Sequence, residues 1–340
     1  MSELRKDPIL DRWVVIAPDR ATRPFDHSGP LAADASADNC PFCRGRESQT
    51  PPATLTIDPD NRCTDGESDW LVRVVPNSYP ALQAAVDHTS SPDQSTSQVT
   101  PFEIAHGHGV HEVIVESPRH VSSMTELDAD QFERILIAWQ TRHSQLARRN
   151  DLAHVSLFKN SGEAAGASLA HVHSQLLATS FVPPQIEAEL QAAASFRQQT
   201  GKSLWSHLLA QEKTEGRRMI SEDDHFSVFC PFASRFPAET WIVPHQARPD
   251  FHAANRDEIQ ELADVLRSTL RRLDFAFKAP AFNLAVHTAP LRAGDRDTFH
   301  WHIEITPRLT GIAGFELGSG TWINIIAPED AAARLRDANG

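Results

Sequence analysis

The chain has 340 residues, of which 40% are hydrophobic and 23% charged, so a globular protein with two domains or two fused halves is expected. Its net charge of −13 and isoelectric point near 5.7 argue against an extended nucleic-acid interface, because such surfaces are basic. The sequence contains no run of 18 apolar residues, and its N-terminus lacks the apolar core of a signal peptide. We therefore expect a cytoplasmic protein that binds neither nucleic acid nor membranes.

The first part of the chain predicts several β-strands and one long helix. β-branched and aromatic runs favour strands at residues 9–17, 71–76, 111–116 and 155–158. Apolar residues at helical spacing predict a helix over 128–149, with Asp128 as its N-cap. A segment rich in Ser, Asp, Thr and Gln, residues 87–101, is predicted to be a loop.

A loop of small residues, 160–170, then runs into two histidines that are one residue apart. If 171–177 is a strand, the side chains of His171, His173 and Gln175 point to the same face. Glycines in the loop allow the backbone to approach a ligand and to offer N–H groups to an anion. The pattern is compatible with a nucleophile beside a phosphate, and the alternative is a polar strand on the surface of a sheet.

The pattern then repeats in the second part of the chain. Residues 185–213 are expected to be mostly helical, followed by strands at 226–231 and 239–244, a helix at 255–277, and strands at 282–287 and 300–305. His300 and His302 follow the first pair of histidines by roughly 130 residues. We interpret this as an internal duplication of an α+β unit, with halves at residues 1–190 and 191–340.

Cys40 and Cys43 form a Cys-Pro-Phe-Cys knuckle. In a chain without an export signal this spacing favours a metal or redox role over a disulfide. A closed tetrahedral zinc site needs two further ligands, and His120 and His171 are the best candidates. The alternative is a pair of partly buried thiols.

With His171 assigned to zinc, His173 remains free to act as a nucleophile or base, and Gln175 can hydrogen-bond the group that is attacked. An imidazole nitrogen that attacks phosphorus splits one displacement into two through a covalent phosphoramidate. The phosphoryl oxygens require cationic or N–H-rich surroundings, which Arg20, Arg23 and the glycine loop can provide. The alternative for these two arginines is a solvated loop.

Together these residues resemble the galactose-1-phosphate uridylyltransferase family, the His-x-His branch of the histidine-triad superfamily. The matching motifs occur in family order and span almost the whole chain: 7–8, 19–24, 40–43, Asn77, 117–120, 160–175, 181–183, 286–290, 300–305 and 314–316.

The resemblance implies an α+β fold of two fused histidine-triad-like halves, a mostly antiparallel sheet flanked by helices, in a homodimer. It implies a ping-pong transfer of UMP from UDP-glucose to galactose 1-phosphate through a uridylyl-His173 intermediate. Gln175 would assist catalysis, and the zinc would be structural, held by Cys40, Cys43, His120 and His171. The substrate-binding set implied by the resemblance is Arg20, Arg23, Asn77, Asn160, Gly166, Ser168, Gln175, Phe315 and Glu316.

Two departures from the family pattern concern the substrate. The best-known bacterial members have Pro between the two histidines and Gly after the second, where this chain has Val172 and Ser174. The same His-Ser-Gln form occurs in relatives that handle adenylyl groups, so an ADP-glucose phosphorylase is the first alternative. The stretch 309–320 also lacks the lysine that enteric members use against the hexose phosphate. A nucleotide hydrolase is a further alternative, which the duplicated length disfavours.

A second metal, iron or zinc, is implied in the second half by Glu189, His287 and His302, with Glu304 in place of the family's last histidine. The alternative is a hydrogen-bonded polar cluster. For a third set, His106, His108 and His111, a solvated loop is favoured over a metal site.

Overall fold

The computed structural model describes residues 2–6, 13–16, 39–64, 69–83 and 102–338. The predicted loop at 87–101 lies outside these residues, and the predicted strand at 9–17 lies partly outside them. No helix among the described residues is both long and apolar enough to cross a membrane.

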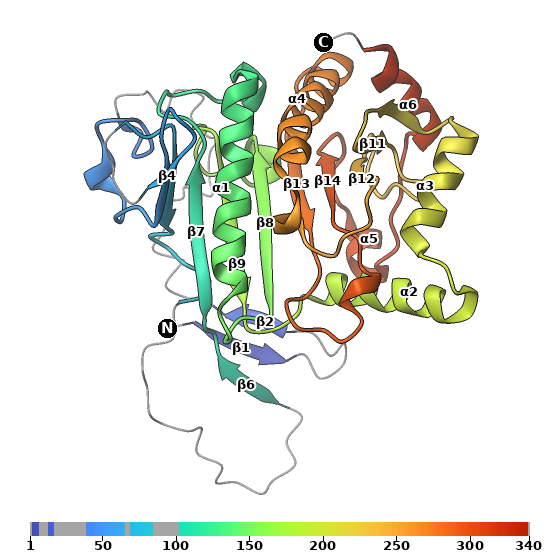
Figure 1. Ribbon diagram of the computed structural model, residues 1–340, viewed down its shortest axis with the longest axis horizontal. Coiled ribbons are helices and arrows are strands. Elements are labelled where there is room, and N and C mark those ends of the chain that lie inside the picture. Colours follow the sequence, from blue (N-terminus) through green and yellow to red (C-terminus); the bar gives the residue numbers. More distant parts are fainter. Residues whose placement is uncertain (1, 7–12, 17–38, 65–68, 84–101, 339–340) are drawn as a thin grey trace, which may run out of the picture.

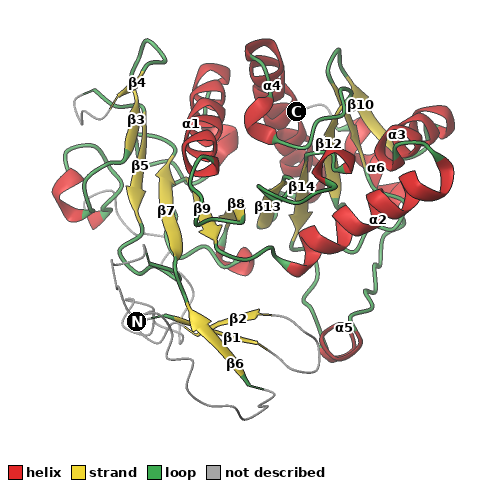
Figure 2. Ribbon diagram, turned by 60° about the horizontal axis from the view of Figure 1, so that its bottom comes forward, coloured by secondary structure: helices red, strands yellow, loops and turns green. Residues whose placement is uncertain are grey.

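The described residues form a large antiparallel sheet of 11 strands and a small sheet of 3 strands, which lies at one end of the molecule (Figures 1 and 2). The large sheet has the order β10-β11-β12-β14-β13-β8-β9-β7-β5-β3-β4, and the small sheet has the order β2-β1-β6. The strands are β1 (Glu3–Lys6), β2 (Trp13–Ile16), β3 (Leu55–Ile57), β4 (Cys63–Thr64), β5 (Val72–Pro76), β6 (Glu103–His106), β7 (Gly109–Val115), β8 (His154–Ser161), β9 (His173–Thr179), β10 (Met219–Glu222), β11 (Phe226–Phe229), β12 (Thr240–Pro244), β13 (Phe282–His287) and β14 (His302–Pro307).

Two long helices, α1 (Ala129–Ala147) and α4 (Arg256–Phe277), lie side by side against one face of the sheet (Figure 1). Both predicted helices are confirmed. Asp128 caps α1 by accepting from the Gln131 N–H, and Asn255 forms a capping box with Glu258 at the start of α4. Their apolar stripes bury the main core against the sheet, and the remaining helices are α2 (Pro184–Thr200), α3 (Leu204–Glu215), α5 (Gly314–Ser319) and α6 (Pro328–Asp337).

The strand order is symmetric about the central pair β8 and β13. On either side follow β9 and β14, then β7 and β12, then β5 and β11, so the two halves of the chain build matching halves of one sheet. The predicted α+β class with a mostly antiparallel sheet is thereby confirmed. Residue 190 falls inside α2, and the division of the chain there stays a prediction.

The strand that carries His173 begins later than the sequence pattern at 171–177 predicts. β9 begins at His173, and the Val172 N–H donates to the carbonyl of Val121, which lies outside the sheet. His171 therefore precedes the strand, and the alternation that aligns His173 with Gln175 does not extend to it. The Phe42 ring contacts both imidazoles, with centroid distances of 6.0 Å to His171 and 5.4 Å to His173.

Two histidines, His143 on α1 and His154 on β8, are buried as neutral groups. Neither ring nitrogen of His143 has a hydrogen-bond partner among the described residues, and Nδ1 of His154 has none either. Burial, reinforced by His252 and His154, lowers the pKa of His143 well below its usual value. Burial also lowers the pKa of His154 to about 3.

Acid should therefore destabilise the fold before the carboxylates titrate. In the unfolded chain these histidines bind protons below the ordinary histidine pKa of about 6.5, whereas in the folded chain they remain neutral. Stability is fully present above that pH and falls as the pH drops, by up to about 1.4 kcal/mol per pH unit for each histidine. Denaturation midpoints between pH 8 and pH 5 should fall less steeply in His143→Leu than in the wild type. Equal slopes would contradict the assignment.

Candidate functional site

A cavity of about 420 Å³ lies on the sheet face opposite α1. His173 and Gln175 line it from β9, Ser168 from the loop before β9, and Asn77 and Tyr79 from the turn after β5. Ser174, between the two β9 residues, points to the other face, where its hydroxyl accepts from the Trp139 indole N–H of α1 at 2.8 Å. Four of the predicted site residues thus meet in one cavity, and Ser174 makes no contact there that could select a substrate.

The hydrogen bonds of His173 decide which of its nitrogens can react. Nδ1 lies 2.8 Å from the carbonyl oxygen of His171, and a carbonyl only accepts, so Nδ1 carries the proton. Nε2 therefore holds the lone pair. The buried ring lines the cavity, and a neutral imidazole nitrogen of this kind can act as a nucleophile.

A buried ion pair holds the backbone of the same residue. The Lys159 ammonium on β8 donates to the His173 carbonyl at 2.9 Å and pairs with the Glu116 carboxylate. Lys159 is only 2% exposed and Glu116 is fully buried. The pairing of β8 with β9 ends at Phe158 and Gln175, so it does not extend to His173. The Lys159 ammonium on β8 donates to the His173 carbonyl beyond this point.

Lys159→Met should strongly destabilise the protein, because it leaves the Glu116 carboxylate buried without its cation. Breaking a buried pair in this way costs about 3–5 kcal/mol. We expect Glu116→Leu in the same chain to restore part of the loss, since it removes the uncompensated charge. The matched control is Arg149→Met, which breaks an exposed pair with Asp151 and should cost less than about 1 kcal/mol in urea unfolding. Similar losses in both single variants would contradict this interpretation.

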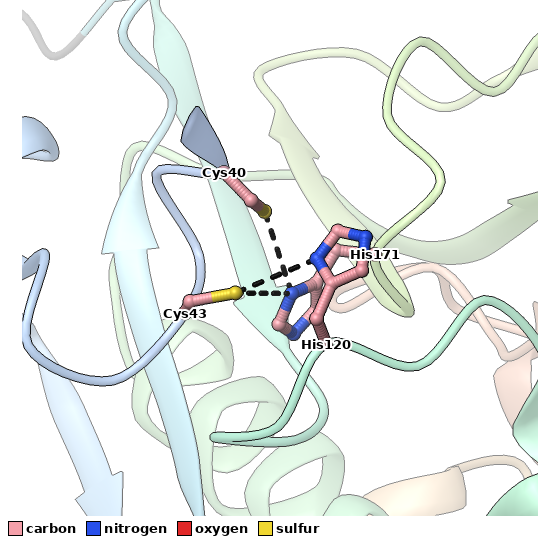
Figure 3. Close-up of side chains that lie close together, drawn as sticks. All are labelled: Cys40, Cys43, His120 and His171. Carbon is pink, nitrogen blue, oxygen red and sulfur yellow. Dashed lines mark hydrogen bonds between the residues drawn. The ribbon is translucent and has the colours of Figure 1, made fainter. Parts of the chain in front are cut away.

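Cys40, Cys43, His120 and His171 converge on one point (Figure 3), and their ligand atoms all lie within 4.8 Å of one another. Nδ1 of His171 lies 3.5 Å from the Cys40 sulfur, and Nδ1 of His120 lies 3.4 Å from the Cys43 sulfur. Two ligands of a tetrahedral zinc ion, one sulfur and one nitrogen, are about 3.6 Å apart. The two sulfur–nitrogen distances are thus close to those around a tetrahedral zinc ion, and the four side chains could hold a metal ion.

The surroundings of these ligands suit a cation. His171 donates from Nε2 to the Ser117 carbonyl at 2.9 Å, which leaves its Nδ1 lone pair directed at the thiols. Burial and the neighbouring Cys40 raise the pKa of the Cys43 thiol to about 11. A bound cation would offset this cost, because it favours the thiolate.

The second predicted ligand set, Glu189, His287, His302 and Glu304, is also brought together, with ligand atoms within 4.8 Å of one another. His287 contacts Glu189 through Nδ1 at 2.9 Å and Glu304 through Nε2 at 3.4 Å. Nε2 of His302 is buried and has no hydrogen-bond partner among the described residues. This orphaned nitrogen could accept a metal ion, so the cluster retains the groups that such an ion requires.

In the same cluster, the carboxylates and the neighbouring cationic groups stabilise one another's charge. Burial alone would raise the pKa of Glu304, but His287, His302 and Arg235 hold it well below its usual range. Burial opposes a charge on His287, yet Glu304 and Glu189 outweigh it and raise its pKa. Arg235 also pairs with Glu239. The hydrogen-bonded polar cluster expected as the alternative to a metal is therefore also compatible with this geometry.

Among the described residues, the rest of the predicted substrate-binding set does not line the cavity. The Asn160 side chain accepts from Asn283 of β13, and Gly166, with φ of +84°, ends a short 3₁₀ turn. Phe315 lies on α5, which stands apart from the other helices in Figure 2. Glu316 follows it on the same helix and does not line the cavity either. Arg20 and Arg23 lie outside the described residues.

His111 does not fit the solvated loop that the sequence favoured. It lies on β7, is 6% exposed, and its Nε2 is 3.0 Å from the Gln175 side-chain oxygen. Its position directly before a β-branched strand was the available signal. A histidine inside a strand that borders the His-x-His strand is a candidate for the site, unlike His106 and His108 before it.

Comparison with known proteins identifies the family. Residues 1–183 match the model of the galactose-1-phosphate uridyl transferase N-terminal domain, and residues 189–338 match that of the C-terminal domain. An ADP-glucose phosphorylase from Arabidopsis thaliana is 34% identical over 99% of this chain and 93% of its own. A galactose-1-phosphate uridylyltransferase from Thermotoga maritima is 27% identical over 99% of this chain and 98% of its own.

Solved structures agree with these relatives. The crystal structure of an Arabidopsis thaliana ADP-glucose phosphorylase with bound ADP-glucose superposes with a TM-score of 0.75, at 32% identity and full coverage of both chains. A uridylyltransferase structure superposes with a TM-score of 0.78, at 27% identity over 99% of this chain and 98% of that one. The two family models together match residues 1–183 and 189–338, and the chain belongs to the galactose-1-phosphate uridyl transferase family.

Proposed function

We propose that this enzyme transfers the adenylyl group of ADP-glucose through a covalent adenylyl-His173 intermediate, with inorganic phosphate as acceptor. The observation that carries the nucleotidyl transfer is the orientation of His173, whose Nδ1–H is held by the His171 carbonyl while Nε2 faces the cavity.

In the first half-reaction His173 Nε2 attacks the α-phosphorus, and the bond from that phosphorus to the bridging oxygen breaks. Glucose 1-phosphate leaves with the bonding electron pair. The positive charge that develops on the imidazole is stabilised by the Nδ1–H donation to the His171 carbonyl. In the second half-reaction a phosphate oxygen attacks the same phosphorus and releases Nε2, which gives ADP.

One observation favours ADP-glucose and phosphate: the Arabidopsis thaliana relative named ADP-glucose phosphorylase is 34% identical over nearly the whole chain. The second candidate is transfer of UMP from UDP-glucose to galactose 1-phosphate, which the Thermotoga maritima relative and the family models favour.

Single-turnover labelling separates these candidates. The enzyme is incubated with ADP-glucose or UDP-glucose, each labelled at the α-phosphorus, and then chased with phosphate or with galactose 1-phosphate. We expect label from ADP-glucose that phosphate removes as ADP. Label only from UDP-glucose, chased by galactose 1-phosphate, would replace the proposal by its alternative. Rapid release of free nucleoside monophosphate without an acceptor would indicate a hydrolase.

We also propose that the first metal site holds structural zinc, because two sulfurs and two imidazoles are the ligands zinc prefers. The second cluster would hold iron or zinc, as its two carboxylates and two imidazoles allow. Metal analysis of the purified protein tests both. A single zinc per chain that persists in His302→Ala would leave the second cluster as an ionic brace.

A homodimer is proposed from the segment around α5. Phe315, Leu317, Ile323 and Ile325 are between 56% and 77% exposed, which is unusual for side chains of this size. If this segment packs on a second chain, Phe315 and Glu316 can reach a cavity that their own chain does not offer them. Mixing His173→Gly with the double variant Phe315→Ala, Glu316→Ala should then restore activity. Sedimentation as a monomer at micromolar concentration would contradict the dimer.

A further inference from the structure

We infer that His111 is a positioning residue that fixes the side-chain amides of Gln175 and Asn77 with their NH₂ groups toward the phosphate of the substrate. The inference rests on the proposed function, because it assigns the direction of two amides at that same site. The three residues come from β7, β9 and the turn after β5.

The tautomer of His111 follows from a backbone contact. The Ala81 N–H lies 3.0 Å from Nδ1 of His111. A backbone N–H can only donate, so Nδ1 is the acceptor and the proton of the neutral ring is on Nε2. The backbone thus determines this proton position, independently of any side chain in the cavity.

The protonated Nε2 then orients Gln175. It lies 3.0 Å from Gln175 Oε1, so the imidazole donates and the amide oxygen accepts. An amide whose oxygen is held in this way must direct its NH₂ group elsewhere, and Gln175 lines the cavity that contains His173. The reverse orientation would place two donors against each other at His111 and turn the carbonyl oxygen toward an anionic substrate.

A second main-chain contact orients Asn77 in the same sense. The Tyr79 N–H donates to Asn77 Oδ1 at 2.8 Å, which identifies that atom as the oxygen. Asn77 Nδ2 lies 3.3 Å from His111 Nε2, and since both atoms carry hydrogens this contact cannot be a strong hydrogen bond. The hydrogens of Asn77 are therefore free to reach a ligand in the cavity, next to those of Gln175.

The duplicated half of the chain contains a parallel arrangement. Glu304 occupies the position after His302 that Gln175 occupies after His173. Arg235 pairs both with Glu304 and with Glu239, which directly precedes β12. In the first half, His111 on the matching strand β7 contacts Gln175 directly. Both halves thus support this position of the His-x-His strand from the neighbouring strand, but only His111 leaves an amide NH₂ group for the ligand.

The test is a mutant cycle that combines His111→Leu with the replacement of both Gln175 and Asn77 by Ala, read out as the rate of covalent labelling of His173 by the labelled nucleotide sugar. If His111 acts through the two amides, His111→Leu should lower kcat/KM of the first half-reaction about 10-fold or more in the wild type. It should have an effect of less than about 2-fold once Gln175 and Asn77 are both replaced by Ala. His111→Gln, which keeps an N–H donor near Gln175 Oε1, should restore most of the rate.

His108→Leu is the matched control, since His108 lies near His111 in sequence but bonds the Asp151 carbonyl at the surface. An equal loss from His111→Leu in all backgrounds would show that it acts on the fold and would overturn the inference. So would a folded His111→Leu enzyme with wild-type rates. If His111→Leu lacks a thermal transition, the same cycle is run with His111→Asn. A wild-type enzyme that no nucleotide sugar labels would instead refute the proposed function.

Discussion

His173→Gly is expected to abolish covalent labelling and to lower turnover by about 10⁴-fold or more, because no other group can form the phosphoramidate. His173 is the imidazole whose Nε2 lone pair lines the cavity. The measurement is acid-precipitable label after incubation with nucleotide sugar labelled at the α-phosphorus, together with steady-state turnover. The melting temperature is measured on the same variant to show that it remains folded.

The duplication offers a matched control for this experiment. His302 repeats the local geometry of His173, because its Nδ1 lies 3.0 Å from the carbonyl oxygen of His300 and it also begins a strand. His302→Gly should retain the covalent label. Loss of label in both variants, with both proteins folded, would mean that the first site alone does not carry the chemistry.

Removing the metal from the Cys40, Cys43, His120 and His171 site should lower the melting temperature by about 10 °C. This corresponds to a loss of about 5 kcal/mol at roughly 2 °C per kcal/mol for a chain of this size. Activity should fall in parallel, because the His171 carbonyl holds the His173 ring. The measurement is thermal denaturation and labelling before and after a chelator, with zinc added back.

Cys43→Ser should reproduce the effect of the chelator and lower the metal content. The control is Cys63→Ser, since Cys63 is exposed and lies on β4 outside the cluster. A melting temperature that is unchanged after the metal is stripped would refute the structural role.

The sequence predicted those features whose signal lies within one short stretch of the chain. The apolar periodicity at 128–149 and 255–277 corresponds to α1 and α4, and the Cys-Pro-Phe-Cys spacing located half of the metal cluster. The duplication was visible because each copy keeps the same order of strands and helix. The family resemblance supplied the pairing of His120 with His171, which spacing alone left as the best choice among several histidines.

The missed features are contacts between residues far apart in the sequence. In the sequence, Lys159 is only a polar residue that follows a predicted strand. Its partner Glu116 lies 43 residues earlier, directly after β7. The role of His111 depends on a backbone N–H from Ala81 and on the Gln175 amide, and no sequence pattern encodes a tautomer. Phe315 and Glu316 were assigned by motif, whereas both lie on α5 and neither lines the cavity.

The central pairing of β8 with β13, from Leu157–Val286 to Ser161–Phe282, also bears on aggregation and on divergence. Taken separately, each half would end in an unprotected strand whose unpaired N–H and C=O groups could recruit other chains. Joined in one polypeptide, the halves cover each other's edge permanently, at any protein concentration. The second copy can therefore carry different side chains while it still covers this edge, and Glu304 stands at the position after His302 that Gln175 occupies after His173.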